Sequence, residues 1–61
     1  MDKSMVEVSG TVKHETDAAI FVDFGDEEVW LPKSQLEEWP ELDETGDVIM
    51  PYWLALDKDL I

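Results

Sequence analysis

Residues 18–32 read AAIFVDFGDEEVWLP, two apolar runs separated by a short polar turn. The first run alternates, and it places three large apolar residues on one face: Ile20, Val22 and Phe24. Ala19 and Phe21 fall on the other face, as in a strand that is covered on both sides. Gly25 can adopt the positive φ of a tight turn, and Pro32 ends the returning strand. This stretch predicts a β-hairpin whose first strand is central in its sheet.

The flanking segments extend this sheet on both sides. Residues 5–13, MVEVSGTVK, alternate with a period of two, and Gly10 inside them predicts a bulge or a sharp bend. Residues 14–17, HETD, are polar and predict the connection to the hairpin. Residues 48–50, VIM, predict a short fourth strand after an acidic loop that turns at Gly46.

Two short helical segments are expected outside the strands. Residues 33–39 are long enough for one or two turns, with Leu36 and Trp39 on one side. Residues 51–58 predict a C-terminal helix that starts at a proline, with Trp53 facing inward.

Together these elements predict one domain over residues 1–61 that is mainly β, a small α+β fold. The expected architecture is a bent antiparallel sheet of 4–5 strands closed into an SH3-like or OB-like small barrel. An open sheet with a helix across one face is the alternative. The predicted core consists of Val6, Val8, Val12, Ile20, Val22, Phe24, Val29, Leu31, Leu36, Val48, Met50, Trp53 and Leu56.

The charge balance is unusual for so short a chain. Sixteen acidic residues stand against four lysines, which gives a net charge of −12, and there is no cysteine. Such a surface disfavours DNA, RNA and anionic lipid as direct ligands, because phosphate binding depends on Lys and Arg. The N-terminus lacks the layout of a signal peptide, and no apolar run approaches a membrane span. We expect a soluble cytoplasmic protein with no membrane contact.

No pattern in the chain predicts an enzyme. His14 is the only histidine and falls in the expected polar connection, while Ser34 suits a turn or a helix cap. Paired carboxylates need a cleft that separates their pKa values, and a chain this short offers little interior. The acidic stretch from Asp43 carries glycine at its fourth position and leucine at its twelfth, so it does not fit a calcium loop. We expect no catalytic residue, no metal site and no cofactor.

Carboxylates instead predict a partner-binding surface. Ten of them lie in residues 23–47 with Lys33 as the only cation: Asp23, Asp26, Glu27, Glu28, Glu37, Glu38, Glu41, Asp43, Glu44 and Asp47. Trp39 completes the predicted site as an exposed anchor, with packing beneath the loop as the alternative. Trp30 should point away from Val29, either against the other face of the sheet or into solvent. Stacking of nucleic-acid bases on these tryptophans would also need a cationic groove.

Two segments of the chain resemble small uncharacterised phage and prophage proteins. The first carries a W-[LI]-P-K-S-Q pattern, at Trp30, Leu31, Pro32, Lys33, Ser34 and Gln35. The second is a P-x-W-L-A-x-x-K-x-L-I-like tail, at Pro51, Trp53, Leu54, Ala55, Lys58, Leu60 and Ile61. The resemblance implies a mobile-element protein in the host cell cytoplasm that counters host machinery, such as an anti-CRISPR or anti-restriction protein. It implies no catalytic residue.

Two functional hypotheses follow. In the first, the acidic surface mimics a nucleic-acid backbone and occupies the basic DNA- or RNA-binding groove of a host defence complex of the CRISPR or restriction type. In the second, the protein is a non-enzymatic accessory or interaction domain whose charge serves solubility or salt tolerance. The first requires the acids to gather on one face, and the second allows an even scatter.

Overall fold

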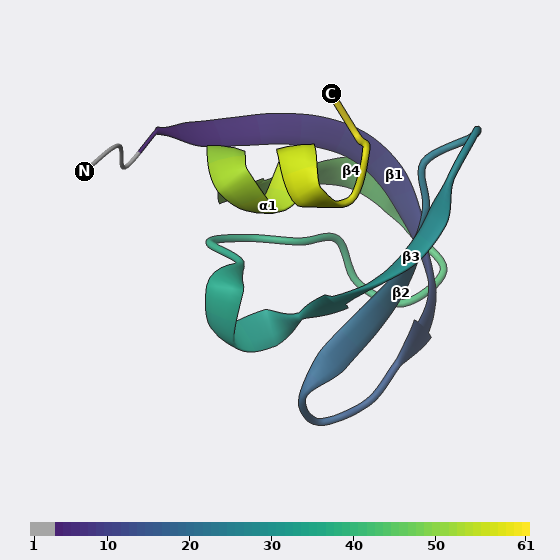
Figure 1. The fold of residues 1–61 in the computed structure, drawn as a ribbon. Helices are drawn as coiled ribbons and strands as arrows, with labels where there is room; N and C mark the ends of the chain where they lie inside the picture. Colours follow the sequence, from purple (N-terminus) through teal and green to yellow (C-terminus); the bar gives the residue numbers. More distant parts are fainter. Residues whose placement is uncertain (1–3) are drawn as a thin grey trace.

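The computed structural model describes residues 4–61, which form a four-stranded antiparallel sheet, one turn of 3-10 helix and one short α-helix (Figure 1). Along the chain the elements are β1 (Met5–Glu15), β2 (Ala19–Asp23), β3 (Glu28–Pro32), η1 (Lys33–Gln35), β4 (Thr45–Pro51) and α1 (Tyr52–Asp57). The strands lie in the order β3-β2-β1-β4. The mainly β fold class is confirmed, and both helical segments are shorter than predicted. Neither helix of the described chain has the length and apolar character needed to cross a membrane.

The long strand β1 joins the two halves of the sheet. It pairs with β4 through Met5–Thr11 and with β2 through Thr11–Glu15. Of the two alternatives predicted at Gly10, the bulge is wrong, because the register shift lies between Val12 and His14, and the sharp bend stays a prediction. β1 therefore changes its pairing partner at Thr11, which pairs regularly with both neighbouring strands. The register shift follows it, between Val12 and His14.

Gly10 is required for packing rather than for a bulge. It pairs regularly with Gly46 across β1 and β4. A Cβ atom at Gly10 would lie 2.6 Å from Val22 Cγ1 and 2.8 Å from Phe24 Cδ1. Side chains of the β2–β3 hairpin therefore pack directly on the backbone of β1, and any side chain at this position would displace them.

Nine apolar side chains form the buried core between the sheet and α1. They are Val12, Ile20, Val22, Leu31, Leu36, Val48, Met50, Leu54 and Ala55. Seven of these are predicted core residues. Four other predicted residues are half-buried against the cluster: Val6, Val8, Phe24 and Val29. The period-two alternation of the strands accounts for nearly all of this agreement.

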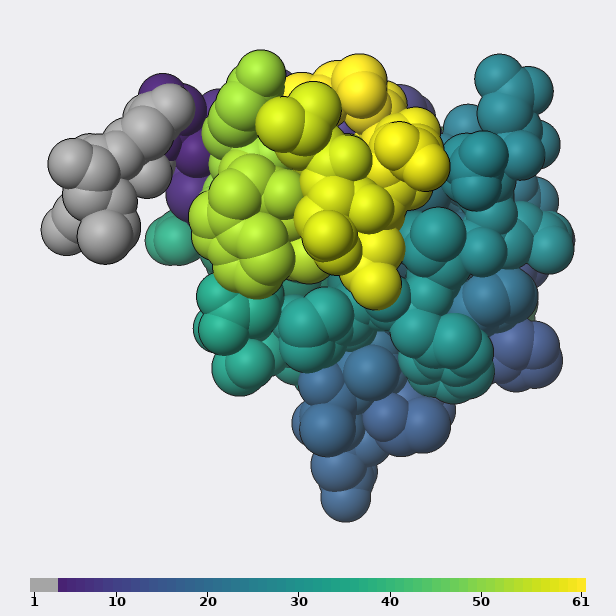
Figure 2. Space-filling model, viewed as in Figure 1, coloured from purple at the N-terminus to yellow at the C-terminus, as the bar shows by residue number. Residues whose placement is uncertain are grey.

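The inward face of α1 differs from the prediction. Trp53 and Leu56 are 53% and 51% exposed, while Leu54 and Ala55 are buried. Pro51 is the N-cap and still belongs to β4, so the helix begins one residue later than predicted. In the space-filling view, α1 and the C-terminal residues cover one flank of the molecule (Figure 2). The predicted core positions of Trp53 and Leu56 are therefore wrong.

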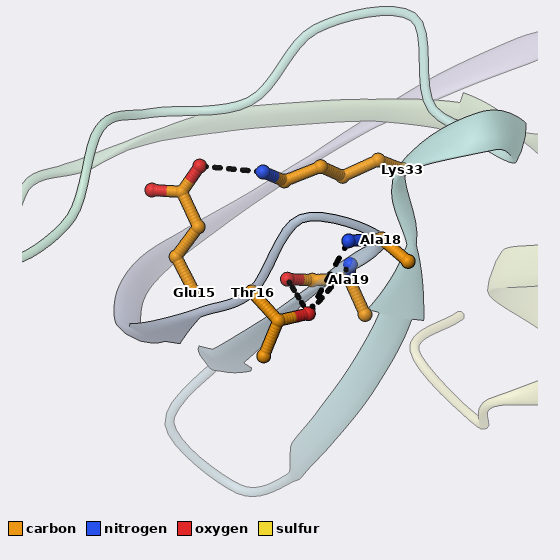
Figure 3. A network of polar contacts seen from close by, with 5 residues as sticks. All are labelled: Glu15, Thr16, Ala18, Ala19 and Lys33. Carbon is orange, nitrogen blue, oxygen red and sulfur yellow. Dashed lines mark hydrogen bonds and ion pairs between the residues drawn. The ribbon is translucent and has the colours of Figure 1, made fainter.

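The turn between β1 and β2 also starts later than predicted. His14 and Glu15 belong to β1, not to the polar connection. The turn is closed by Thr16, whose Oγ1 accepts a hydrogen bond from the Ala19 backbone N–H at 3.0 Å (Figure 3). The Lys33 N–H donates to the Ala18 carbonyl at 2.8 Å, which holds the start of η1 against this turn.

The other two turns each contain a residue with positive φ. Gly25 has φ 102° in the β2–β3 turn, as predicted. In the acidic loop the predicted turn at Gly46 is wrong, since Gly46 lies within β4. That loop turns where the Glu44 N–H donates to the Glu41 carbonyl at 2.9 Å, with Asp43 at φ 68°. Aspartate tolerates this conformation better than most residues.

The free edge of β4 is covered by the segment that follows η1. The Glu37 N–H donates to the Ile49 carbonyl at 2.8 Å, and the Ile49 N–H donates to the Glu38 carbonyl at 2.9 Å. This bridge spans part of the opening between the two edge strands of the sheet. The result is an open four-stranded sheet with a barrel-like curl.

The Gly10→Ala variant should be destabilised, because its new methyl group meets Val22 and Phe24 in a closely packed region. We expect a loss of about 1–3 kcal/mol, typical of overpacking in a core. Urea unfolding followed by circular dichroism measures the change. Gly46→Ala is the matched control, since its Cβ would lie 3.3 Å from Pro40 Cγ and meet less resistance. Equal midpoints for Gly10→Ala and the native chain would contradict this account of the packing.

Candidate functional site on the outer face of the sheet

The outer face of the sheet is the side turned away from the core. Residues that pair across antiparallel strands point to the same side, so each row of pairs shares a face. One such row crosses all four strands and consists of Glu28, Asp23, Thr11 and Thr45. The hydroxyl oxygens of Thr11 and Thr45 are hydrogen-bonded at 2.6 Å, which confirms that they share a side. This row places two carboxylates and two hydroxyls in a line on the outer face.

The next row toward the β1–β2 turn is aromatic. Trp30 pairs with Phe21 and Phe21 pairs with His14 across β3, β2 and β1. Ring centroids are 5.2 Å apart between Phe21 and Trp30 and 5.7 Å apart between His14 and Phe21, with tilted planes. Trp30 is 47% exposed and His14 is also exposed. We call His14, Phe21 and Trp30 the aromatic row.

Seven predicted site residues lie in two segments that each contact β1 near Thr11, the β2–β3 hairpin and the chain that leads into β4. Four lie in or beside the β2–β3 turn and three at the start of β4: Asp23, Asp26, Glu27, Glu28, Asp43, Glu44 and Asp47. Thr11 pairs with Asp23 on one side, and Val12 is hydrogen-bonded to the main chain of Asp43 and Glu44 on the other. Two strand spacings, about 10 Å, separate the two groups. We call these seven acids the carboxylate band.

The remaining predicted residues lie at the other end of β4. Glu37, Glu38 and Trp39 line a shallow, open hollow of about 310 Å³. Trp39 is half-buried and packs against the core, so it is only partly available as an anchor. The Lys33 Nζ lies 5.9 Å from the centre of its ring. Glu41 is exposed in the loop that leads away from the hollow.

Charges in the described chain are almost entirely unscreened by ion pairs. Fifteen of the sixteen acids lie within residues 4–61, and all except half-buried Asp23 are exposed. The single ion pair of residues 4–61 joins Lys33 Nζ to Glu15 Oε2 at 2.6 Å (Figure 3). Five acids outside the predicted segment lie on β1, its following turn and the C-terminal region: Glu7, Glu15, Asp17, Asp57 and Asp59.

Lysines are absent from the paired rows. Every residue that pairs across β1 to β4 is apolar, polar or acidic, and none is a lysine. Within residues 4–61 no polar or charged side chain is buried, and no three His, Asp or Glu residues are placed to hold a metal ion. The paired rows therefore carry carboxylates and no lysine, while exposed Lys13 lies unpaired at the register shift of β1.

The aromatic row was missing from the sequence prediction. His14 was placed in the polar connection, and Phe21 had no role beyond covering the strand. The available signal was the hairpin itself, because a turn centred on Gly25 and Asp26 pairs Phe21 with Trp30. No pattern along the chain places His14 beside them, since the register shift in β1 decides that neighbour.

Comparison with known proteins gives one match. The family model described as S1 domain matches residues 7–50, from the third residue of β1 to the last but one of β4, well over half of the chain. Neither the curated proteins nor the solved structures contain a match. The matched residues include the carboxylate band and the aromatic row and stop before α1. The chain therefore belongs to the S1 domain family.

Proposed function

We propose that this S1-type domain is a non-enzymatic inhibitor whose acidic outer face occupies the basic nucleic-acid-binding surface of another protein. The observation that carries the proposal is the outer face itself, where the carboxylate band adjoins the aromatic row and the paired rows contain no lysine. Folds of the OB type use this kind of strand surface to bind oligonucleotides. In this chain the same surface is negatively charged, as nucleic acid is, whereas a surface that binds nucleic acid is positively charged.

Electrostatics supports a cationic protein as the ligand. A net charge of −12 on 61 residues repels phosphates and attracts a groove lined by Lys and Arg. Duplex DNA carries about one charge per 1.7 Å of axis, and carboxylates on adjacent strands and turns approach that density over a short distance. Trp30 adds an exposed aromatic surface that charge alone does not provide, and aromatic residues are common hot spots of protein interfaces.

The target that we propose is a host defence complex of the CRISPR or restriction type. This part of the proposal rests on the resemblance of residues 30–35 and 51–61 to small phage and prophage proteins. Such complexes hold DNA or RNA in basic channels, which is the chemistry that the carboxylate band matches. The alternative that the acids serve only solubility makes no demand on where they lie.

A second candidate function is the binding of single-stranded nucleic acid. It is favoured by the aromatic row, because bases stack on exposed rings with about 1–3 kcal/mol per base. Folds of the S1 and OB type often bind nucleic acid. The adjacent acids Asp23 and Glu28 oppose this function, and Lys13 is the only described lysine next to the row.

Reversing charge in the carboxylate band should abolish inhibition. We expect Glu27→Lys/Glu28→Lys to weaken competition with labelled duplex DNA for a CRISPR effector complex or a restriction endonuclease by about tenfold or more. Asp17→Lys/Asp57→Lys is the control, because it changes the charge equally at distant exposed positions. Fluorescence anisotropy at about 50 and 200 mM salt measures both variants and the salt dependence. Equal losses in the two variants would show that the position of the charge is unimportant, as a solubility role implies.

The choice between protein and nucleic acid can be tested with one oligonucleotide. We expect a labelled single-stranded RNA to bind with a Kd weaker than about 100 µM at physiological salt, the weak end of non-specific binding. Trp30→Ala should reduce the competition with duplex DNA, while Trp30→Phe keeps an aromatic ring as the control. Tight RNA binding that is lost in Trp30→Ala would favour the second candidate and refute the first.

A further inference from the structure

The outward side of α1 is an apolar surface apart from the outer face of the sheet. Tyr52, Trp53 and Leu56 are 44%, 53% and 51% exposed, and their spacing places them on neighbouring positions of one helical side. Ile61 adds a further residue that is 55% exposed at the end of the chain. The opposite side of α1 is buried in the core, so this apolar side has no partner within the described chain.

Next to α1 lies the hollow of Glu37, Glu38 and Trp39. The bridge between Glu38 and Ile49 holds this segment on the edge of β4, and α1 begins three residues after Ile49. In Figure 1 the loop that follows η1 runs beside α1. Figure 2 shows α1 and this loop on the same face of the molecule. The helix and the segment that lines the hollow therefore lie on the same face of the molecule.

The hollow has the chemistry of a site for a cationic side chain. Two carboxylates stand at its wall beside the face of an indole ring. Within the molecule, Lys33 Nζ already lies 5.9 Å from the centre of the Trp39 ring, so this ring attracts a cation. Lys33 also binds Glu15, and Glu37 and Glu38 have no lysine of their own in the described chain.

The negative charge of the protein indicates which kind of partner can bind this surface. A second copy would bring together two chains of net charge −12, and anionic lipid would meet the same repulsion. Asp57 and Asp59 extend the negative charge along the border of the apolar side. We propose that α1 and the hollow form a docking surface for a basic amphipathic segment of a protein. Its apolar side chains cover Trp53 and Leu56, and one of its Lys or Arg side chains enters the hollow.

This surface is distinct from the one used in the proposed function. The aromatic row lies on the outer face of the sheet, whereas α1 packs on the inner face through Leu54 and Ala55. The family match also ends at residue 50, before α1 begins. A protein with both surfaces can contact a basic groove and a flanking basic segment at once, or two different partners.

A designed peptide tests the docking surface directly. The probe is a fluorescent 14-residue helical peptide of leucine and lysine, and its control is a peptide of the same composition in a non-amphipathic order. We expect Trp53→Ala in the full chain to weaken binding roughly 10- to 30-fold, as for an aromatic hot spot. Leu42→Ala is the matched control, because Leu42 is an apolar residue of similar exposure outside α1 and the hollow, and it should leave peptide binding unchanged. Glu37→Gln/Glu38→Gln should weaken binding and reduce its salt dependence.

The possible outcomes separate this proposal from its competitors. Equal binding of the two peptides, or equal loss in Leu42→Ala and Trp53→Ala, would overturn it. A dimer in sedimentation that Trp53→Ala dissociates would assign the surface to a second copy. Binding to phosphatidylglycerol vesicles that depends on Trp53 would assign it to a membrane. The proposed function is tested separately, by the DNA competition assay with Glu27→Lys/Glu28→Lys. A failure of the proposed function can therefore be distinguished from a failure of the docking surface.

Discussion

The structure depends on the double pairing of β1. One strand of eleven residues forms hydrogen bonds to β4 along its first half and to β2 along its second, and β3 is attached only through β2. Next to the residue at which β1 changes its pairing partner, Gly10 has no side chain. Val22 and Phe24 can therefore pack on the backbone of β1. This register also fixes which residues face outward. A slip of one residue would turn the carboxylates of the outer face into the core, so the same constraint that forms the core also forms the candidate site.

The fold tolerates its charge because strand alternation separates charge from core. Every described acid except Asp23 is exposed, and nine apolar side chains form an interior that contains no charged or polar side chain. No described carboxylate is fully buried, so the main electrostatic cost is repulsion across the surface rather than burial. Such repulsion is screened by salt over about 10 Å at 0.1 M, comparable to the width of two strand spacings in the carboxylate band. Added salt should therefore raise the stability of the fold and weaken the proposed binding to a basic partner.

The strands could be predicted from the sequence, whereas the helix phase and the register could not. Alternation in residues 5–13 and 18–32 identifies both the strands and their buried faces. The helix carries the run Tyr52–Leu56, in which all five residues are apolar, so no polar position marks the outward side. In the folded chain, Leu54 and the small residue Ala55 are the helix residues that pack against the core. His14 and Glu15 read as a loop because exposed residues at the end of a strand can be as polar as loop residues. The acids were found by composition, but their grouping around Thr11 depends on pairing between residues far apart in the chain.

Membership of the S1 family determines the backbone of this surface but not the charge of its ligand. The face that presents the aromatic row is built from three strands, and its side chains point outward, where substitutions cost little stability. Acids at such positions are compatible with the sheet, and in the proposed function they select a basic partner in place of a phosphate. An aromatic ring serves both cases, because it stacks on a base or contacts an Arg side chain. The same argument extends to α1, which follows the matched residues and adds an exposed apolar surface outside the sheet. A fold associated with nucleic acid can in this way become a binder of basic proteins through changes confined to exposed positions.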